Sequence, residues 1–164
     1  MILADRNEGS RNSMRRNERQ IIDRDSIDNI ISRCRVCRLG MCDNGQPYIV
    51  PLSFGYDGRF LYFHAAPEGR KVDILKRNKR VCFEFDILGE VISSSQACNW
   101  SMNYESVIGS GLAEIVAGAD AKKAALDCIM RQYSSSDWTF TEQALEATLV
   151  VCVRIEEMCG KARL

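Results

Sequence analysis

Apolar and polar residues alternate along much of this chain, and this pattern predicts β-strands. Successive side chains of a strand point to opposite faces, so a strand with one buried face shows a period of two. We expect six strands from this pattern, at residues 36–42, 48–56, 60–63, 81–87, 106–116 and 149–155.

Short turn signals separate the first three predicted strands. Asn44-Gly45 and Asp57-Gly58 are typical of tight hairpins, because the central residues of such turns adopt positive φ. We therefore expect these strands to form a three-stranded meander. Gly109 and Gly111 interrupt the fifth strand, which predicts a bulge or a close approach of another backbone.

Three segments instead show helical periodicity. Asp25 is a candidate N-cap for a helix whose apolar residues Ile27, Ile30, Ile31 and Cys34 share one face, and residues 70–78 and 120–133 predict two more helices. A parallel sheet would need a helix after nearly every strand. The pattern therefore predicts a mainly β fold with short helices, a six-stranded antiparallel β-barrel.

The length and charge of the chain limit the kinds of protein it can be. Its 164 residues suffice for one domain, which we expect at residues 21–164 after a mobile tail at residues 1–20. Equal numbers of basic and acidic residues, 22 of each, argue against nucleic acid or an anionic membrane as partner. Without an apolar run of about 20 residues or a signal peptide, we expect a cytoplasmic protein.

The eight cysteines raise the question of a metal site. Cys34-x-x-Cys37 has the spacing of a zinc half-site, but no second pair follows and His64 is the only histidine. Cys34 continues the apolar face of the first helix, and Cys37 begins a strand. We therefore interpret both as structural, expect all cysteines to be reduced, and predict no metal site.

One segment does carry candidate chemistry. A strand ends near His64, Gly69 bends the chain, and Arg70 and Lys71 open a helix. Free N–H groups and the dipole at a helix start favour an anion, and a guanidinium adds bidentate hydrogen bonds, so a phosphate fits here. On this segment alone, solvated surface cations are an equally good interpretation. His64 is a structural imidazole or, beside the cations, a functional one.

Taken in order, the sequence motifs resemble a known family. Tyr-Ile-Val-Pro-Leu-Ser-Phe-Gly-Tyr at 48–56, Leu-Tyr-Phe-His-Ala-Ala at 61–66 and Glu-Gly-Arg-Lys at 68–71 are followed by Val-Cys-Phe-Glu at 81–84, Cys-Asn-Trp-Ser at 98–101 and Tyr-Glu-Ser-Val-Ile-Gly at 104–109. This series is similar to the nitroimidazole-resistance branch of the split β-barrels that bind flavin mononucleotide (FMN), which are related to pyridoxamine 5′-phosphate oxidase. The resemblance spans roughly residues 14 to 161.

The resemblance implies a homodimer with two FMN sites in the clefts between the subunits. Arg70 and Lys71 would hold the phosphate beside the strand end, and residues 50–53 would line the isoalloxazine ring. The segment around Tyr104 would lie near the flavin or at the dimer interface. The residues that it assigns to cofactor binding are Val50, Pro51, Leu52, Ser53, Phe63, His64, Ala65, Arg70, Lys71, Tyr104, Ser106 and Val107.

The resemblance also implies an activity. We expect an FMN-dependent oxidoreductase that takes electrons from NADH or NADPH and reduces a small molecule, with 5-nitroimidazoles and other nitro-aromatic compounds as candidates. His64 is the candidate catalytic residue, as a hydrogen-bond donor or orienting group. The alternative is a flavin- or haem-related binding protein of the same fold without turnover. A vitamin B6 phosphate oxidase is a third possibility, and such enzymes resemble this chain less closely.

Overall fold

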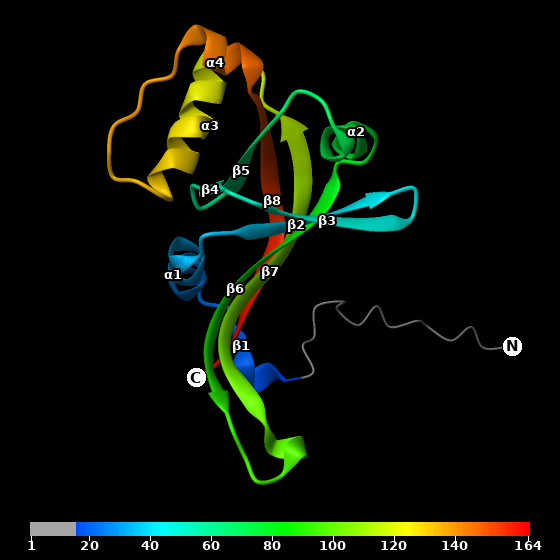
Figure 1. The fold of residues 1–164 in the computed structure, drawn as a ribbon, viewed down its shortest axis with the longest axis vertical. Coiled ribbons are helices and arrows are strands. Elements are labelled where there is room, and N and C mark those ends of the chain that lie inside the picture. Colours follow the sequence, from blue (N-terminus) through cyan, green and yellow to red (C-terminus); the bar gives the residue numbers. More distant parts are fainter. Residues whose placement is uncertain (1–15) are drawn as a thin grey trace, which may run out of the picture.

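An antiparallel sheet of eight strands forms the body of the protein in the computed structural model, which describes residues 16–164 (Figure 1). The strand order is β3-β2-β6-β7-β8-β5-β4, and β1 pairs with β8. The strands are β1 (Gln20–Ile21), β2 (Cys37–Asp43), β3 (Gln46–Leu52), β4 (Gly55–Tyr56), β5 (Phe60–Ala65), β6 (Arg80–Ile92), β7 (Ser101–Ile115) and β8 (Leu149–Arg163). The helices are α1 (Arg24–Arg33), α2 (Arg70–Arg77), α3 (Ala119–Arg131) and α4 (Glu142–Ala147), with 3₁₀ turns at Asn17–Arg19 and Ala97–Asn99.

The mainly β, antiparallel class predicted from the alternation is confirmed. The six predicted strands correspond to β2, β3 with β4, β5, β6, β7 and β8, while β1 is a two-residue strand that the pattern did not predict. β6, β7 and β8 are also longer than predicted. β6 and β7 continue past the end of β8 as a two-stranded arm, where both faces are exposed and the apolar alternation is lost (Figure 1).

The predicted meander of the first three strands is wrong. β2 pairs with β3, but β3 lies at one end of the strand order and β4 and β5 lie at the other. Ser53 and Phe54 break the predicted strand at 48–56 into β3 and β4. Because the chain passes directly from one edge of the sheet to the other, these two residues close the sheet into a barrel.

The two predicted turns differ in detail. Asn44 and Gly45 both have positive φ, 50° and 87°, as a type I′ turn requires. In the β4–β5 turn only Gly58 has positive φ, and the Asp57 carboxylate instead accepts hydrogen bonds from the N–H groups of Arg59 and Phe60. Asp57 therefore stabilises this turn with its side chain.

Both expectations for the glycines of β7 are confirmed. The pairing of β7 with β8 shifts register between Ser110 and Gly111, which is a bulge. A Cβ atom on Gly109 would lie 2.3 Å from Cζ of Phe83, and one on Gly111 would lie 2.2 Å from the carbonyl oxygen of Arg154. Any larger residue at either position would force the neighbouring strand or ring to move.

The first helix begins slightly earlier than predicted. Asp23, and not Asp25, is the N-cap, because its carboxylate accepts a hydrogen bond from the backbone N–H of Ser26 at 2.9 Å. Asp25 lies in the first turn. The predicted inner face is confirmed: Ile27, Ile30, Ile31 and Cys34 are all buried.

The other helices agree with the periodicity, with one addition. α2 and α3 match the predicted helices at residues 70–78 and 120–133, and their ends differ from the predicted ends by at most two residues. α4 was not predicted, since its six residues are too few to show a period; Thr141 caps it by accepting from the N–H of Ala144. None of the helices in residues 16–164 has the length and apolar character needed to cross a membrane.

Regular structure at the N-terminus starts before the predicted domain boundary at residue 21. Asn17–Arg19 form a 3₁₀ turn, and in β1 Gln20 pairs with Lys161 and Ile21 with Gly160. The predicted tail otherwise falls largely on residues 1–15, which lie outside the described residues.

Aromatic rings fill the centre of the barrel, and Phe54 joins them to α3. Its ring packs edge-on against Phe85, with the ring centroids 4.8 Å apart. Its backbone N–H donates to the hydroxyl of Tyr133 at 2.9 Å, and that hydroxyl donates to the carbonyl oxygen of Arg35, also at 2.9 Å. One phenol therefore connects the β3–β4 joint to the segment between α1 and β2.

We predict that Tyr133→Phe lowers the free energy of unfolding by about 1 to 3 kcal/mol, because Phe54 is buried and its N–H would lose its partner. Urea denaturation at fixed protein concentration measures the change. Tyr48→Phe is the matched control, because no residue among 16–164 hydrogen-bonds to the Tyr48 hydroxyl. Equal stability of the two variants would contradict this role of Tyr133.

Candidate functional site

The two predicted phosphate ligands open α2, and their surroundings differ. The guanidinium of Arg70 lies over the ring of Tyr48, 4.4 Å from its centroid, and its Nε is 3.9 Å from the carboxylate of Asp43. The ammonium of Lys71 is half-buried, and this burial lowers its pKa. Among residues 16–164 it has no hydrogen-bond or ion-pair partner.

An unpaired, partly desolvated cation is the feature that marks this place as a site. Burial of a charge without a counter-ion is unfavourable, so an anion that reached Lys71 would be stabilised. α2 adds to this, because no side chain caps its first N–H groups and Gly69 before it has a φ of 126° that few residues other than glycine adopt. The donors present therefore fit a phosphate group.

The end of β5 lies close to this helix start. His64 is exposed and Ala65 half-buried, whereas Phe63 is buried in the core and can offer only backbone atoms to a ligand. Four residues separate Ala65 from Arg70, so the two lie within about 18 Å of each other. The predicted strand end and cation pair therefore belong to one region.

β3 reaches the same region from the other side of the barrel joint. Tyr48, which contacts Arg70, precedes the predicted ring-lining residues by two positions. Among those residues Val50 and Leu52 are half-buried against the core, and Pro51 and Ser53 are exposed. Gly55 of β4 pairs with Tyr62 of β5. Ser53 comes two residues before Gly55, and His64 comes two residues after Tyr62. The end of β3 is thus connected to the end of β5 through the short strand β4.

Two strand-pairing routes place the predicted residues of β7 differently relative to this region. Val107 is fully buried in the core, while Tyr104 and Ser106 are half-buried. Phe63 pairs with Val151, which pairs with Ile115 at the other end of β7. Nine residues, about 30 Å along the strand, separate Ser106 from that level. Pro51, by contrast, is level with Ile108 through Arg38 and Glu84, so the predicted residues of β3 lie two strands across from this part of β7.

The sequence analysis missed an ion pair beside the cations. Arg77, at the end of α2, donates to Asp43 at 2.8 Å, so one carboxylate on the β2–β3 hairpin faces two arginines of the helix. The spacing was a usable signal, since residues seven apart are two helical turns apart and share a face. Nothing in the pattern, however, points from Arg70 to Tyr48.

Cys34 and Cys37 are structural residues, as predicted. Both are buried in the core, and burial raises the pKa of the Cys34 thiol to about 11 and that of Cys37 further. They are therefore neutral thiols, poor as metal ligands or nucleophiles. None of the eight cysteines, all within residues 16–164, is in a disulfide, and this part of the chain has no group of three or more His, Cys, Asp or Glu residues placed to hold a metal ion.

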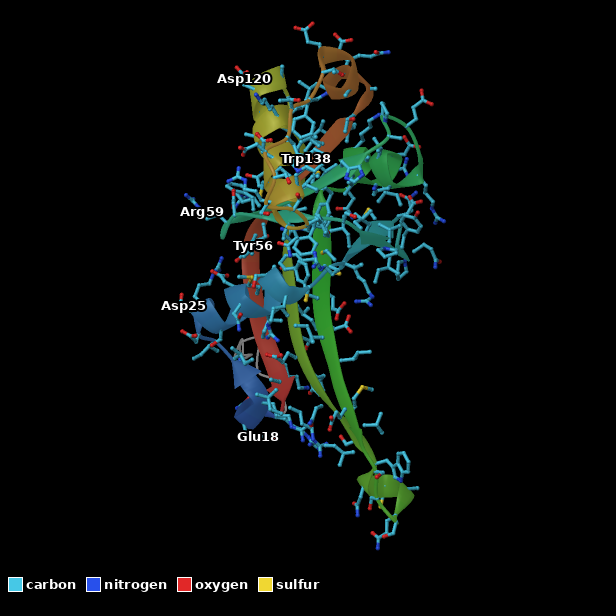
Figure 2. The ribbon with its side chains drawn as sticks, turned by 60° about the vertical axis from the view of Figure 1, so that its left-hand side comes forward. Glu18, Asp25, Tyr56, Arg59, Asp120 and Trp138 are labelled. Carbon is cyan, nitrogen blue, oxygen red and sulfur yellow. The ribbon has the colours of Figure 1, made fainter. Side chains whose placement is uncertain are left out.

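Two of the cavities among residues 16–164 lie on different elements of the fold. The larger, about 790 Å³, lies between α3 and strands β4, β5 and β8, beside Tyr56, which is next to α1 and α3 (Figure 2). Neither cavity is lined by a predicted site residue. In the larger one, Asp57 and Tyr62 are hydrogen-bonded to each other at 2.8 Å. The smaller, about 510 Å³, has a mostly apolar wall that includes Tyr48 and Ile49 of β3. We assign the candidate site to the β3 side, where the unpaired cation lies.

Comparisons with known proteins agree with this fold. A crystal structure of a candidate 5-nitroimidazole antibiotic resistance protein from Bacteroides thetaiotaomicron is 35% identical, with 87% of this chain and 86% of that chain covered and a TM-score of 0.80. A flavocytochrome from Azotobacter vinelandii (23% identical, 93% and 72% covered, TM-score 0.83) and a FAD- and haem-binding protein from Mycobacterium smegmatis (21%, 88% and 73%, 0.81) share the fold.

A curated protein of Rhizobium meliloti (strain 1021) whose function is not characterised is 29% identical over 65 residues. This match covers 40% of the chain and 42% of that relative, so the chain spans less than half of its length. The sequence profile of the pyridoxamine 5′-phosphate oxidase family matches residues 23–162, which include strands β2 to β7, all but the last residue of β8, and the candidate site. The chain therefore belongs to the pyridoxamine 5′-phosphate oxidase family.

Proposed function

We propose that this protein binds FMN and acts as an oxidoreductase that reduces nitro-aromatic compounds with electrons from NADH or NADPH. The observation that carries the proposal is the half-buried ammonium of Lys71, which lacks a partner among residues 16–164 and lies at an uncapped helix start beside Arg70. Family membership and the 35% identity to a candidate 5-nitroimidazole resistance protein support it.

The phosphate of FMN would be held by Arg70, Lys71 and the first N–H groups of α2. A terminal phosphate suits this arrangement, because two cations and free N–H groups together can meet its charge and its several oxygens. Residues 50–53 of β3 and the backbone at Ala65 would hold the ring. When bound, the flavin supplies the redox chemistry, and the protein positions it and excludes competing reactions.

His64 is the proposed catalytic residue. Its imidazole is exposed near the end of β5, where His64 pairs with Val150 of β8. An imidazole can donate and accept hydrogen bonds through its two nitrogens, so His64 can orient a polar group of the substrate or deliver a proton to it. Among residues 16–164 no hydrogen bond or ion pair engages the His64 side chain, which leaves it available.

We propose a homodimer, because Tyr104 and Ser106 lie about 30 Å or more along β7 from the level of the β5 end that carries His64. A partner related by two-fold symmetry can offer Tyr104 and Ser106 to the site of the first copy. Exposed apolar side chains support this proposal. Ile49 (63% exposed) and Ile108 (56%) lie on one face of the sheet, and Leu88, Val91, Trp100 and Met102 lie on the β6–β7 arm. Such surfaces mark interaction sites on soluble proteins.

The substrate class follows from similarity and from the character of the cavity. The relative with 35% identity is described by resistance to 5-nitroimidazoles, which are small planar nitro-aromatic compounds. The mostly apolar wall of the cavity beside Tyr48 suits a planar ring of this kind. A flavin- or haem-related binding protein without turnover is the alternative, and the same experiment separates the two.

We predict that protein purified in FMN-containing buffer is yellow and that acid denaturation releases FMN and not FAD. Under anaerobic conditions NADH or NADPH should bleach the bound flavin, because the proposed activity requires electron transfer from a nicotinamide. A 5-nitroimidazole added next should restore the yellow colour. Chromatography of the released flavin and the visible absorbance measure both steps.

The matched control is His64→Ala, which removes the exposed imidazole without touching the core. It should still bind FMN, and it should reoxidise more slowly with the nitro compound. If the protein binds FMN but neither NADH nor NADPH reduces the bound flavin, it is a flavin-binding protein without turnover. If the protein stays colourless after FMN is added, the cofactor proposal is wrong.

We predict that replacing Arg70 and Lys71 together by alanine weakens FMN binding at least tenfold, because each charge-assisted hydrogen bond contributes about 1.5 to 3 kcal/mol. Fluorescence titration measures the dissociation constant. Riboflavin lacks the phosphate, so its weaker binding should be nearly the same in parent and variant. The thermal midpoint of the apoprotein should shift little. FMN binding as tight as that of the parent would place the phosphate elsewhere.

We predict a homodimer at micromolar concentration, measured by light scattering coupled to size-exclusion chromatography. Ile108→Glu should shift the mass toward the monomer, because the exposed isoleucine lies on the proposed interface and a carboxylate cannot be buried there without a partner. Lys123→Glu, an exposed charge on α3, is the control. A monomer that binds FMN fully would contradict the shared site.

A further inference from the structure

The Asp43 carboxylate is shared unequally between two arginines of α2. Arg77 donates from Nη2 at 2.8 Å, a charge-assisted hydrogen bond. Arg70 approaches only with Nε, at 3.9 Å, which is too long for a hydrogen bond. Both Arg70 and Arg77 have about half of their side chains exposed, so each is free to move.

Tyr48 holds Arg70 from the other direction. The centroid of its ring is 4.4 Å from Cζ of Arg70, well inside the range of a cation–π contact. Stacking uses the flat face of the guanidinium and leaves its N–H edge free. Among residues 16–164 neither Nη1 nor Nη2 of Arg70 has a hydrogen-bond or ion-pair partner.

Asp43 is nonetheless a competitor for that free edge. A carboxylate and a guanidinium form bidentate pairs readily, and a small rotation of Arg70 would bring its Nη atoms toward Asp43. The Arg77 hydrogen bond opposes this rotation by occupying and neutralising the carboxylate. Asn78 fixes the geometry, because its amide donates to the carbonyl oxygen of Cys42 at 3.2 Å and holds the hairpin against the end of α2.

We propose that Tyr48 and Arg77 are positioning residues that keep Arg70 available for the phosphate of the flavin: Tyr48 orients the guanidinium by stacking, and Arg77 prevents Asp43 from capturing it. This inference rests on the proposed function, because it names residues that act on a phosphate ligand. It adds a specific dependence: when Asp43 loses its hydrogen bond from Arg77, the Asp43 carboxylate weakens the binding of the phosphate by Arg70.

The test is a double-mutant cycle read by the FMN dissociation constant. Arg77→Gln should weaken FMN binding about threefold, because Asp43 then pairs with Arg70. Asp43→Asn in the same chain should restore the parent affinity, because the competing charge is gone. A purely structural role of the Arg77–Asp43 pair predicts the opposite, namely that the double variant stays as weak as Arg77→Gln.

The stacking contact is tested separately. Tyr48→Leu should weaken FMN binding about threefold, and Tyr48→Phe should keep the parent value, because the contact uses the ring and not the hydroxyl. Riboflavin binding reports the fold of the site, and each variant should bind it as the parent does. Thermal denaturation of each apoprotein confirms that the variants are folded.

The outcomes separate this inference from the proposed function. If the parent binds neither FMN nor riboflavin, both proposals are overturned. If the parent binds FMN and Arg77→Gln binds it equally well, only the positioning role is overturned. The positioning role is also overturned if Asp43→Asn fails to restore the affinity, or if riboflavin binding falls in parallel with FMN binding.

Discussion

The fold depends on two residues, Ser53 and Phe54, that carry the chain from one edge of the sheet to the other. Phe54 leaves the strand pairing there, and its N–H would be buried without a partner if Tyr133 did not accept from it. The close approach of α3 that places Tyr133 requires Gly55, where a Cβ would lie 2.6 Å from the backbone nitrogen of Ile129. Barrel closure and helix docking therefore depend on the same contact.

The candidate site is a consequence of this closure. Because β3 turns directly into β4, which pairs with β5, the chain after β5 can place the start of α2 over Tyr48. The cations there differ in their pairing: Asp43 accepts a hydrogen bond from Arg77, whereas Lys71 has no counter-charge among residues 16–164. The barrel thus holds a positive charge where three segments distant in sequence meet.

Local signals in the sequence predicted local structure well. The period of two located six strands, and Asn44-Gly45 and Gly109 were interpreted correctly because each reports a backbone constraint within a few residues. The strand order was mispredicted because the break at Ser53 and Phe54 retains the alternating pattern, and only the contact with Tyr133, 79 residues away, reveals it. Likewise Arg70 and Lys71 could be recognised from their helix start, but the stacking of Arg70 on Tyr48 depends on long-range packing.

The β6–β7 arm is held together differently from the rest of the molecule. Beyond Tyr104, where β8 ends its pairing, the two strands pair only with each other (Figure 2). The guanidinium of Arg163 in β8 also donates to the hydroxyl of Ser101 in this arm. A two-stranded ribbon opens at little free-energy cost, so its amide hydrogens should exchange with solvent long before those of the barrel. Substitutions, insertions or deletions in the arm leave the aromatic core intact. The surface that the arm offers to other molecules can therefore diverge between relatives while the barrel stays the same.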